Sequence, residues 1–162
     1  MSKFYTGIGS RETPQSILEF MRDIAIYLRN DGYILRSGGA DGADSAFENG
    51  AICNAHIFLP WKNFNDNPSP LYNITKEAEA MAEKYHPWFR NLKQGARKLH
   101  SRNCYQVLGE NLDTPSEFLI CWTPGGLETG GTSQALRIAK DYNIRIYNLA
   151  KEEDLEYWRS KL

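Results

Sequence analysis

Three glycine-rich stretches combine residue types that bind anions. They are residues 7–11 (GIGSR), 37–44 (SGGADGAD) and 123–132 (TPGGLETGGT), and each follows an apolar segment. Glycine lets a ligand approach the backbone without meeting a side chain. Where a helix begins directly behind the glycines, its first N–H groups and the positive end of its dipole attract an anion, usually a phosphate. The stretches therefore predict a phosphate-binding site, although glycines also serve tight turns and close packing of helices on strands.

Most candidate ligand-binding residues lie in or beside these stretches. They offer backbone N–H groups, hydroxyls, a guanidinium and a carboxylate. Trp122 or Trp61, each at the end of a predicted strand, could border a base, although packing is the alternative role for both. The candidates are Gly9, Ser10, Arg11, Ser37, Gly38, Gly39, Gly42, Asp44, Trp122, Thr123, Pro124, Gly125, Gly126, Gly130, Gly131 and Thr132. We expect a phosphate to lie on the backbone of the third stretch and a ribose to contact the second. Asp44 has a second interpretation, as a residue that caps the helix behind it.

A basic and polar stretch, residues 93–106, supplies three further candidates. His100 and Asn103 share one side of a predicted helix, and Arg102 lies next to them. An arginine can bind a phosphate with two hydrogen bonds. We therefore add these three residues to the site. The alternative interpretation is a solvated helix face.

Several common functions are disfavoured. None of the glycine stretches matches the P-loop pattern of ATP-hydrolysing proteins, and the first stretch is not a dinucleotide-binding G-x-G-x-x-G. We therefore predict no cofactor. Cys53, Cys104 and Cys121 lack the spacing of metal ligands or of disulfide partners, so no metal site is predicted. Cys53 and Cys121 lie in apolar contexts, which predicts core positions for both.

Length and charge favour an intracellular protein with a small ligand. The 162 residues fit one domain, 1–162, and the net charge of −1 gives no general attraction to nucleic acid or membranes. The sequence lacks an apolar run long enough to span a bilayer and a signal-peptide pattern at its start. We expect a cytoplasmic protein without a membrane partner.

Strands and helices alternate along the sequence. We predict strands at 4–9, 33–36, 55–60, 118–122 and 144–149, and helices at 14–30, 43–52, 75–86, 93–109, 132–142 and 151–162. This order predicts an α/β fold, a single Rossmann-like domain with a mainly parallel sheet and helices on both faces. Ligands bind such sheets at the carboxyl ends of the strands. The three glycine stretches should therefore meet at one edge. The polar segment 63–73 should form an exposed excursion.

The motifs together resemble one known superfamily. GIGSR, SGGADGAD, and TPGG followed by GGTSQALRIA are similar to the SLOG superfamily, which joins the DNA-processing protein DprA with the LOG-type phosphoribohydrolases. The resemblance spans roughly residues 4–149. SGGADGAD resembles a DprA turn, and LHSRN (99–103) followed by TPGG resembles the LOG order M-H-x-R-K … P-G-G-x-G-T-x-x-E. The resemblance implies a nucleotide or nucleotide-derived ligand with its phosphate on the glycine turns.

The LOG residues for cleavage of the base–ribose bond are only partly present. Arg102 matches the LOG arginine, whereas Asn103 replaces the lysine and Ala135 stands where the glutamate would be. Cleavage of this bond builds positive charge on the ribose and needs a carboxylate nearby. If the protein is an enzyme, we expect Arg102 and Glu128 to be the catalytic residues.

Three functions stay open from the sequence. The first is a protein that binds a nucleotide as a sensor, carrier or sequestering protein. The second is a phosphoribohydrolase-type N-glycosidase acting on nucleotides. The third is DprA-like binding of single-stranded DNA, which the near-neutral charge disfavours because phosphate neutralisation dominates such binding. Relatives of this type imply a homodimer or a higher homo-oligomer.

Overall fold

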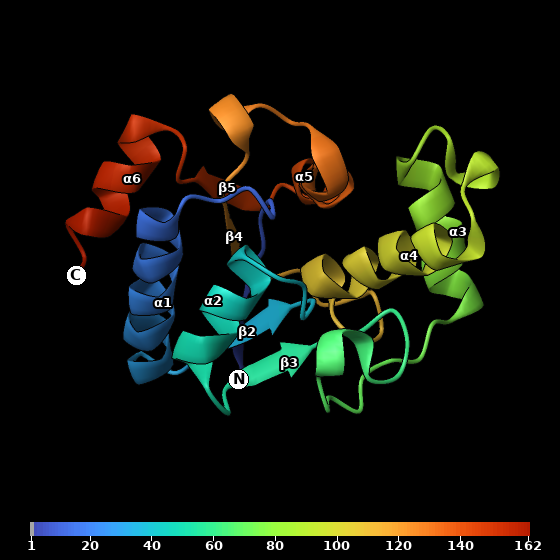
Figure 1. The fold of residues 1–162 in the computed structure, drawn as a ribbon, viewed down its shortest axis with the longest axis horizontal. Helices are drawn as coiled ribbons and strands as arrows, with labels where there is room; N and C mark the ends of the chain where they lie inside the picture. The colour runs from blue at the N-terminus through green and yellow to red at the C-terminus, as the bar shows by residue number, and fades with distance from the viewer. Residues whose placement is uncertain (1) are drawn as a thin grey trace.

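The computed structural model describes residues 2–162 and consists of a parallel sheet between two groups of helices (Figure 1). Within these residues the strands are β1 (Lys3–Gly7), β2 (Tyr33–Ser37), β3 (Ala55–Ile57), β4 (Phe118–Cys121) and β5 (Arg145–Asn148). The α-helices are α1 (Gln15–Asn30), α2 (Ala43–Ala51), α3 (Lys76–Tyr85), α4 (Gln94–Leu108), α5 (Ser133–Asp141) and α6 (Glu152–Arg159). The predicted α/β class and parallel sheet are confirmed.

The direction in which successive strands are added to the sheet reverses between β1 and β4. The five strands lie in the order β3-β2-β1-β4-β5, and every neighbouring pair is parallel. The chain therefore builds one half of the sheet outward from β1 and then returns to start the other half at β4. In open parallel sheets a ligand site lies at this switch point, beyond the carboxyl ends of the strands.

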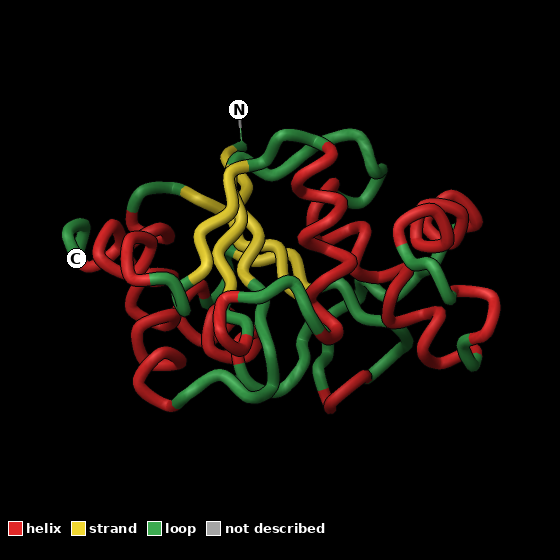
Figure 2. The backbone as a smooth tube through the Cα atoms, turned by 90° about the horizontal axis from the view of Figure 1, so that it is seen from above, coloured by secondary structure: helices red, strands yellow, loops and turns green. Residues whose placement is uncertain are grey.

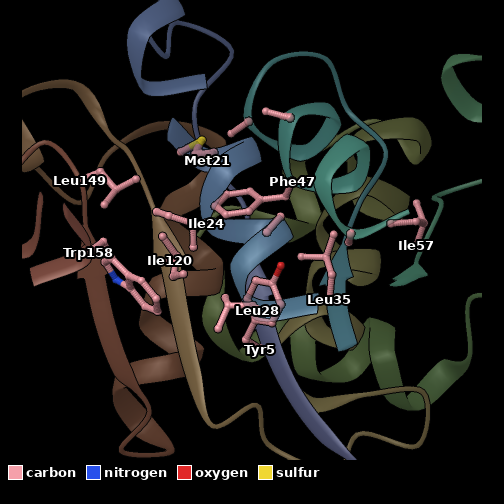
Figure 3. Close-up of a cluster of buried hydrophobic side chains, with 14 of the residues drawn as sticks. Tyr5, Met21, Ile24, Leu28, Leu35, Phe47, Ile57, Ile120, Leu149 and Trp158 are labelled. Carbon is pink, nitrogen blue, oxygen red and sulfur yellow. The ribbon is translucent and has the colours of Figure 1, made fainter. Parts of the chain in front are cut away.

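Helices α1, α2 and α6 cover one face of the sheet. The apolar side chains of α1 recur at helical spacing, and Met21, Ile24 and Leu28 are buried. They pack with Phe47 of α2 and Trp158 of α6 into one core cluster. Figure 3 shows this cluster around the strands, and Figure 2 shows helices on both sides of the sheet.

Helices α4 and α5 cover the opposite face, with α3 packed outside α4. Cys104 and Val107 of α4 and Ile138 of α5 pack against Leu119 of β4 in a second core cluster. Ala82 of α3 belongs to the same cluster. The second half of α4 is buried, so the side chains of its inner face are fixed where they meet the sheet.

Two predictions differ from the structure. The predicted strand 55–60 ends at Ile57, because Phe58 pairs with Leu71 of the returning segment and Leu59 donates its N–H to the Leu71 carbonyl at 2.8 Å. The prediction that Cys53 is a core residue is wrong. Cys53 is exposed because it lies in the turn after α2, where the chain leaves the core.

Candidate functional site

A cavity of about 360 Å³ opens at the switch point between β1 and β4. The loop after β1, the turn before α2, helix α4 and the loop before α5 form its walls. The predicted site residues that line it are Gly9, Ser10, Arg11, Asp44, His100, Arg102, Asn103, Pro124, Gly130, Gly131 and Thr132. All three glycine stretches and the basic stretch thus contribute to one cavity.

The remaining candidates lie behind the cavity wall or beside it. Ser37, Gly38, Gly39, Gly42, Trp122, Thr123, Gly125, Gly126 and Glu128 are not among its lining residues. Ser37 is fully buried and donates a hydrogen bond of 2.6 Å to the Gly7 carbonyl. Trp122 packs against the first core cluster. Ser37 and Trp122 are therefore held by the protein itself.

Arg102 is a buried cation at the inner end of the cavity. Only 5 % of the residue is exposed. Its Nη1 donates to the Gly38 carbonyl and, at 3.2 Å, to the Phe58 carbonyl, and its Nε donates to Asn103 Oδ1 at 3.1 Å. Burial lowers the pKa of Arg102 to about 10, although the carboxylate of Asp44 opposes this shift. Protein oxygens therefore fix the guanidinium, while Arg102 still lines the cavity.

Asp44 places a buried carboxylate beside Arg102. Its Oδ2 accepts the N–H of Ala40 at 3.2 Å, so the side chain folds back onto the turn that precedes α2. Burial raises the pKa of Asp44 to about 6, and the Arg102 charge and hydrogen bonds from this turn lower it again in part. The carboxylate occupies the first turn of α2, where an anion is favoured by the helix dipole. The start of α2 therefore already holds an anion that belongs to the protein.

The start of α5 lacks such an internal anion. Its first turn contains no acidic residue, and its N-cap Thr132 forms no side-chain cap hydrogen bond. Within residues 2–162, the N–H groups of Gly131 and Thr132 donate to no backbone carbonyl outside the helices and strands. Both residues line the cavity. The Gly131 N–H, the helix dipole and the lack of an internal anion together make this the stronger of the two helix starts for an external anion.

Gly131 is open to the cavity in a way that protein packing does not require. A Cβ on Gly131 would meet no heavy atom within 4 Å, and its φ lies outside the left-handed region. Gly130 also faces open space, but its φ of 73° favours glycine by itself. Glycine at 131 therefore leaves space in front of the backbone that no protein atom fills.

Other glycines are explained by the protein itself. A Cβ on Gly9 would lie 2.8 Å from Ala43 Cβ and 3.2 Å from the Trp122 carbonyl oxygen. A Cβ on Gly38 would lie only 1.9 Å from Gln106 Nε2. These glycines allow α2 and α4 to approach the strand ends closely, so their presence does not require a ligand.

Gln134 of α5 contacts α4 beneath the cavity. Its side chain is fully buried; Oε1 lies 3.1 Å from His100 Nδ1 and accepts from Asn103 Nδ2 at 3.3 Å. Its Nε2 donates to the Ala82 carbonyl at 3.2 Å. Burial lowers the pKa of His100, which favours the neutral ring at pH 7. Gln134 thus orients two cavity residues without lining the cavity itself.

The carboxylates near the ligand space are Asp44 and Glu12, both of which line the cavity. Glu128 forms an ion pair with Lys140 of α5 and lies outside the lining. Ala135, where the resemblance to LOG enzymes would require a glutamate, does line the cavity. The cavity wall therefore has a methyl group at the position of that glutamate.

Some lining residues were not among the predicted site residues. They are Ile8, Glu12, Ala40, Leu99, Gln106, Thr129 and Ala135. The sequence already placed Gln106 on the side of the predicted helix that carries His100 and Asn103, although not in the list of site residues. Helical spacing from Arg102 could have found Leu99, because residues three apart share a helix face. Glu12 directly follows the predicted Arg11. The other four carry no signal of their own, since apolar or small residues become cavity walls only through tertiary packing.

No group of three or more His, Cys, Asp and Glu residues within 2–162 is arranged to hold a metal ion. Among the same residues, no helix has both the length and the apolar character that a membrane span needs.

The sequence matches no protein-family model and no curated protein. Among solved structures, the fold is similar to that of DNA processing protein A from Helicobacter pylori, whose structure is described for its single-stranded DNA binding mode. The TM-score is 0.59 at 18 % sequence identity. The match covers 91 % of this chain but spans only 64 % of the other chain. This similarity shows a shared fold.

Proposed function

We propose that this chain binds a nucleotide or nucleotide-derived ligand through its phosphate, at the start of α5. The observation that carries the proposal is Gly131, whose backbone faces the cavity with no protein atom within 4 Å of a Cβ there. Unused N–H donors at a helix start favour a phosphate. The motif resemblance to the SLOG superfamily supports the same ligand class and a place for this chain in that superfamily.

The charges around the cavity suit a nucleotide better than a bare anion. Arg102 and Arg11 supply positive charge for a phosphate, whereas Asp44 and Glu12 are acceptors for hydroxyl groups. A ribose phosphate carries both kinds of group. The cavity volume of about 360 Å³ lies at the lower end of the range for small-molecule sites, which favours a mononucleotide unit over a dinucleotide.

Calorimetry with Gly131→Ala tests the proposal. The probes are AMP and ribose 5-phosphate. We expect both to bind the wild-type protein, and Gly131→Ala to weaken both at least about tenfold, because the methyl group occupies the phosphate position. The melting temperature should not change, since a Cβ there meets no neighbour.

Gly95→Ala is the matched control. Gly95 is also a glycine without a positive φ, and a Cβ there would meet only a Trp61 ring carbon at 3.9 Å. This variant should bind ribose 5-phosphate as the wild type does. The proposal is wrong if the wild-type protein binds neither probe, or if Gly131→Ala binds both with wild-type affinity. Mass spectrometry of the incubated AMP shows whether free base is released, which would establish the N-glycosidase alternative.

Single-stranded DNA is the second candidate ligand, and the comparison with solved structures favours it. A solved structure with a similar fold, DNA processing protein A from Helicobacter pylori, is described for its single-stranded DNA binding mode. A strand would place one of its phosphates at the same helix start. Fluorescence anisotropy with a labelled oligothymidylate tests this. An affinity that falls steeply with salt would support DNA as the ligand, and no binding at low salt would contradict it.

A further inference from the structure

The segment that joins β3 to α3 (Figure 1) carries two aromatic residues, the exposed Trp61 and the half-buried Phe64. Trp61 is 40 % exposed, and its ring contacts the Phe64 ring edge to face with 5.3 Å between centroids. The Phe64 ring centroid lies 5.6 Å from Arg102 Cζ. A short chain of contacts therefore connects an exposed indole ring to the buried cation of the cavity.

Helix α4 provides a second connection between Trp61 and the cavity. Leu99, Arg102 and Gln106 line the cavity and follow each other at spacings of three and four residues, so they share one face of the helix. Gly95 lies four residues before Leu99 on the same face, next to Trp61. The seven residues from Gly95 to Arg102 correspond to about 10 Å along the helix axis. Trp61 thus stands at the outer end of the face that forms the cavity wall.

Gly95 has no structural reason to be glycine. Its φ is not positive, and a Cβ would have only the Trp61 ring within 4 Å, at an ordinary contact distance. The residue leaves the space beside the indole ring empty, as Gly131 does in front of the backbone of the loop.

The segment that carries Trp61 is held firmly against the second glycine turn. Asn65 Nδ2 donates to the Gly39 carbonyl at 3.1 Å and to Asp41 Oδ1 at 2.9 Å. Asn67 Nδ2 donates to both carboxylate oxygens of Glu48 at 3.0 Å. These bonds fix the backbone that carries Phe64, the ring against which Trp61 packs.

The cavity itself offers no aromatic surface. Within residues 2–162 its lining contains no phenylalanine, tyrosine or tryptophan. Trp122 packs against the first core cluster instead. A nucleobase binds proteins mainly by stacking on an aromatic ring and by hydrogen bonds to its edges. Trp61 is the exposed aromatic ring that the contacts above connect to the cavity.

We propose that Trp61 is the stacking surface for a nucleobase whose phosphate lies at the start of α5. This inference rests on the proposed function and assigns the part of the ligand that the cavity does not hold. The base belongs either to the bound mononucleotide itself or to a neighbouring nucleotide of a single strand. The shared chemistry is a flat aromatic base on the indole ring.

Two variants test this inference with AMP and ribose 5-phosphate as probes. Trp61→Ala removes the ring, and Gly95→Leu keeps the ring but places a helix-favouring side chain beside it. We expect each to weaken AMP binding about tenfold, as loss of one stacked base does, and to leave ribose 5-phosphate binding unchanged. Trp88→Ala is the control, since Trp88 is 67 % exposed and outside the cavity lining. It should bind both probes as the wild type does.

The outcomes separate the two proposals. Unchanged AMP affinity in both variants overturns the role of Trp61 while the phosphate site stands. Equal weakening of AMP and ribose 5-phosphate also overturns it, because the ring would then act only through the fold. Failure of the wild-type protein to bind either probe overturns the proposed function, and this inference with it, unless an oligothymidylate binds and depends on Trp61. That last result assigns the base to a DNA strand, whereas weaker AMP binding in the two variants assigns it to a mononucleotide.

Discussion

The turn before α2 and the turn before α5 have similar glycine-rich sequences, but the protein fills the first and leaves the second open. In the turn before α2, the Gly38 carbonyl accepts a hydrogen bond from Arg102, and the Gln106 side chain occupies the space in front of Gly38. The carboxylate of Asp44 occupies the start of α2. In the turn before α5, Gly130 and Gly131 face empty space. The first helical turn of α5 has no acidic residue.

This difference shows that a glycine-rich turn before a helix has two separate uses. In the turn before α2, glycine lets side chains of the same protein reach the backbone, and these side chains form part of the cavity wall. In the turn before α5, the same residue type leaves open the space in which we propose that a ligand binds. The neighbours of each glycine distinguish the two uses, and those neighbours come from distant parts of the sequence.

Arg102→Ala should have the largest effect, because Arg102 belongs to both regions. We expect the free energy of unfolding to fall by about 3 kcal/mol, since the buried Asp44 carboxylate loses its charge partner. Nucleotide affinity should fall at least tenfold. Urea denaturation and calorimetry measure the two effects. Arg11→Ala, at an exposed arginine of the same cavity, should leave the stability nearly unchanged. Unchanged nucleotide affinity in Arg102→Ala would contradict the phosphate site.

Gly38→Ala tests the filled turn directly. Its Cβ would overlap Gln106 and lie 2.6 Å from Arg102 Nη1, so both side chains must move. Overpacking of this kind costs about 2–3 kcal/mol. Thermal denaturation should show a clear drop in melting temperature, whereas Gly131→Ala should melt as the wild type does. Equal melting temperatures for the two variants would remove the distinction between the turns.

Asp44→Asn tests the effect of burying the Asp44 carboxyl group at the start of α2. Because burial raises the folded-state pKa of Asp44 to about 6, its stabilising effect is present below pH 4 and is lost as the pH rises through 6. The wild-type protein should therefore lose on the order of 2 kcal/mol between pH 4 and 7 that Asp44→Asn does not lose. Urea denaturation of both proteins over this range gives the difference. Parallel pH curves would show that Asp44 titrates normally.

Glu128→Gln should have the smallest effect. Glu128 pairs with an exposed lysine, and such surface pairs contribute less than about 1 kcal/mol. It also lies outside the cavity lining. We expect unchanged AMP affinity by calorimetry. If the incubation releases free base, we expect the rate to persist in this variant and to fall in Asp44→Asn. A rate lost only in Glu128→Gln would restore Glu128 as a catalytic residue.

Local sequence patterns were sufficient to predict the helices and strands of the fold. The spacing of Met21, Ile24 and Leu28 predicted the buried face of α1, and Thr75 caps α3 as its position before an acidic, alanine-rich segment suggests. Strand ends were less predictable. The strand at 55–60 is shorter than its apolar residues suggest, because Phe58 and Leu59 pair with Leu71, which lies beyond a long excursion.

The candidate site was predictable in part. Glycine stretches after strands identified Gly131 and Thr132 as site candidates, because parallel strand ends meet at one edge. The basic stretch 93–106 identified Arg102. Packing determined the rest. Trp122 is at a strand end but packs into the core, whereas Trp61, at the end of another apolar segment, stays exposed next to Phe64. Sequence position alone could not separate these two tryptophans.

The sequence by itself determined the alternation of strands and helices, the parallel sheet and the edge at which the glycine stretches meet, because these depend on local periodicity and on turn residues. Only the tertiary structure decided which glycines face protein and which face the cavity, that Asp44 rather than Glu128 lies beside Arg102, and that Gln134 is buried beneath the site. The physical reason is that burial, pKa and empty space depend on neighbours that the chain brings together only when it folds.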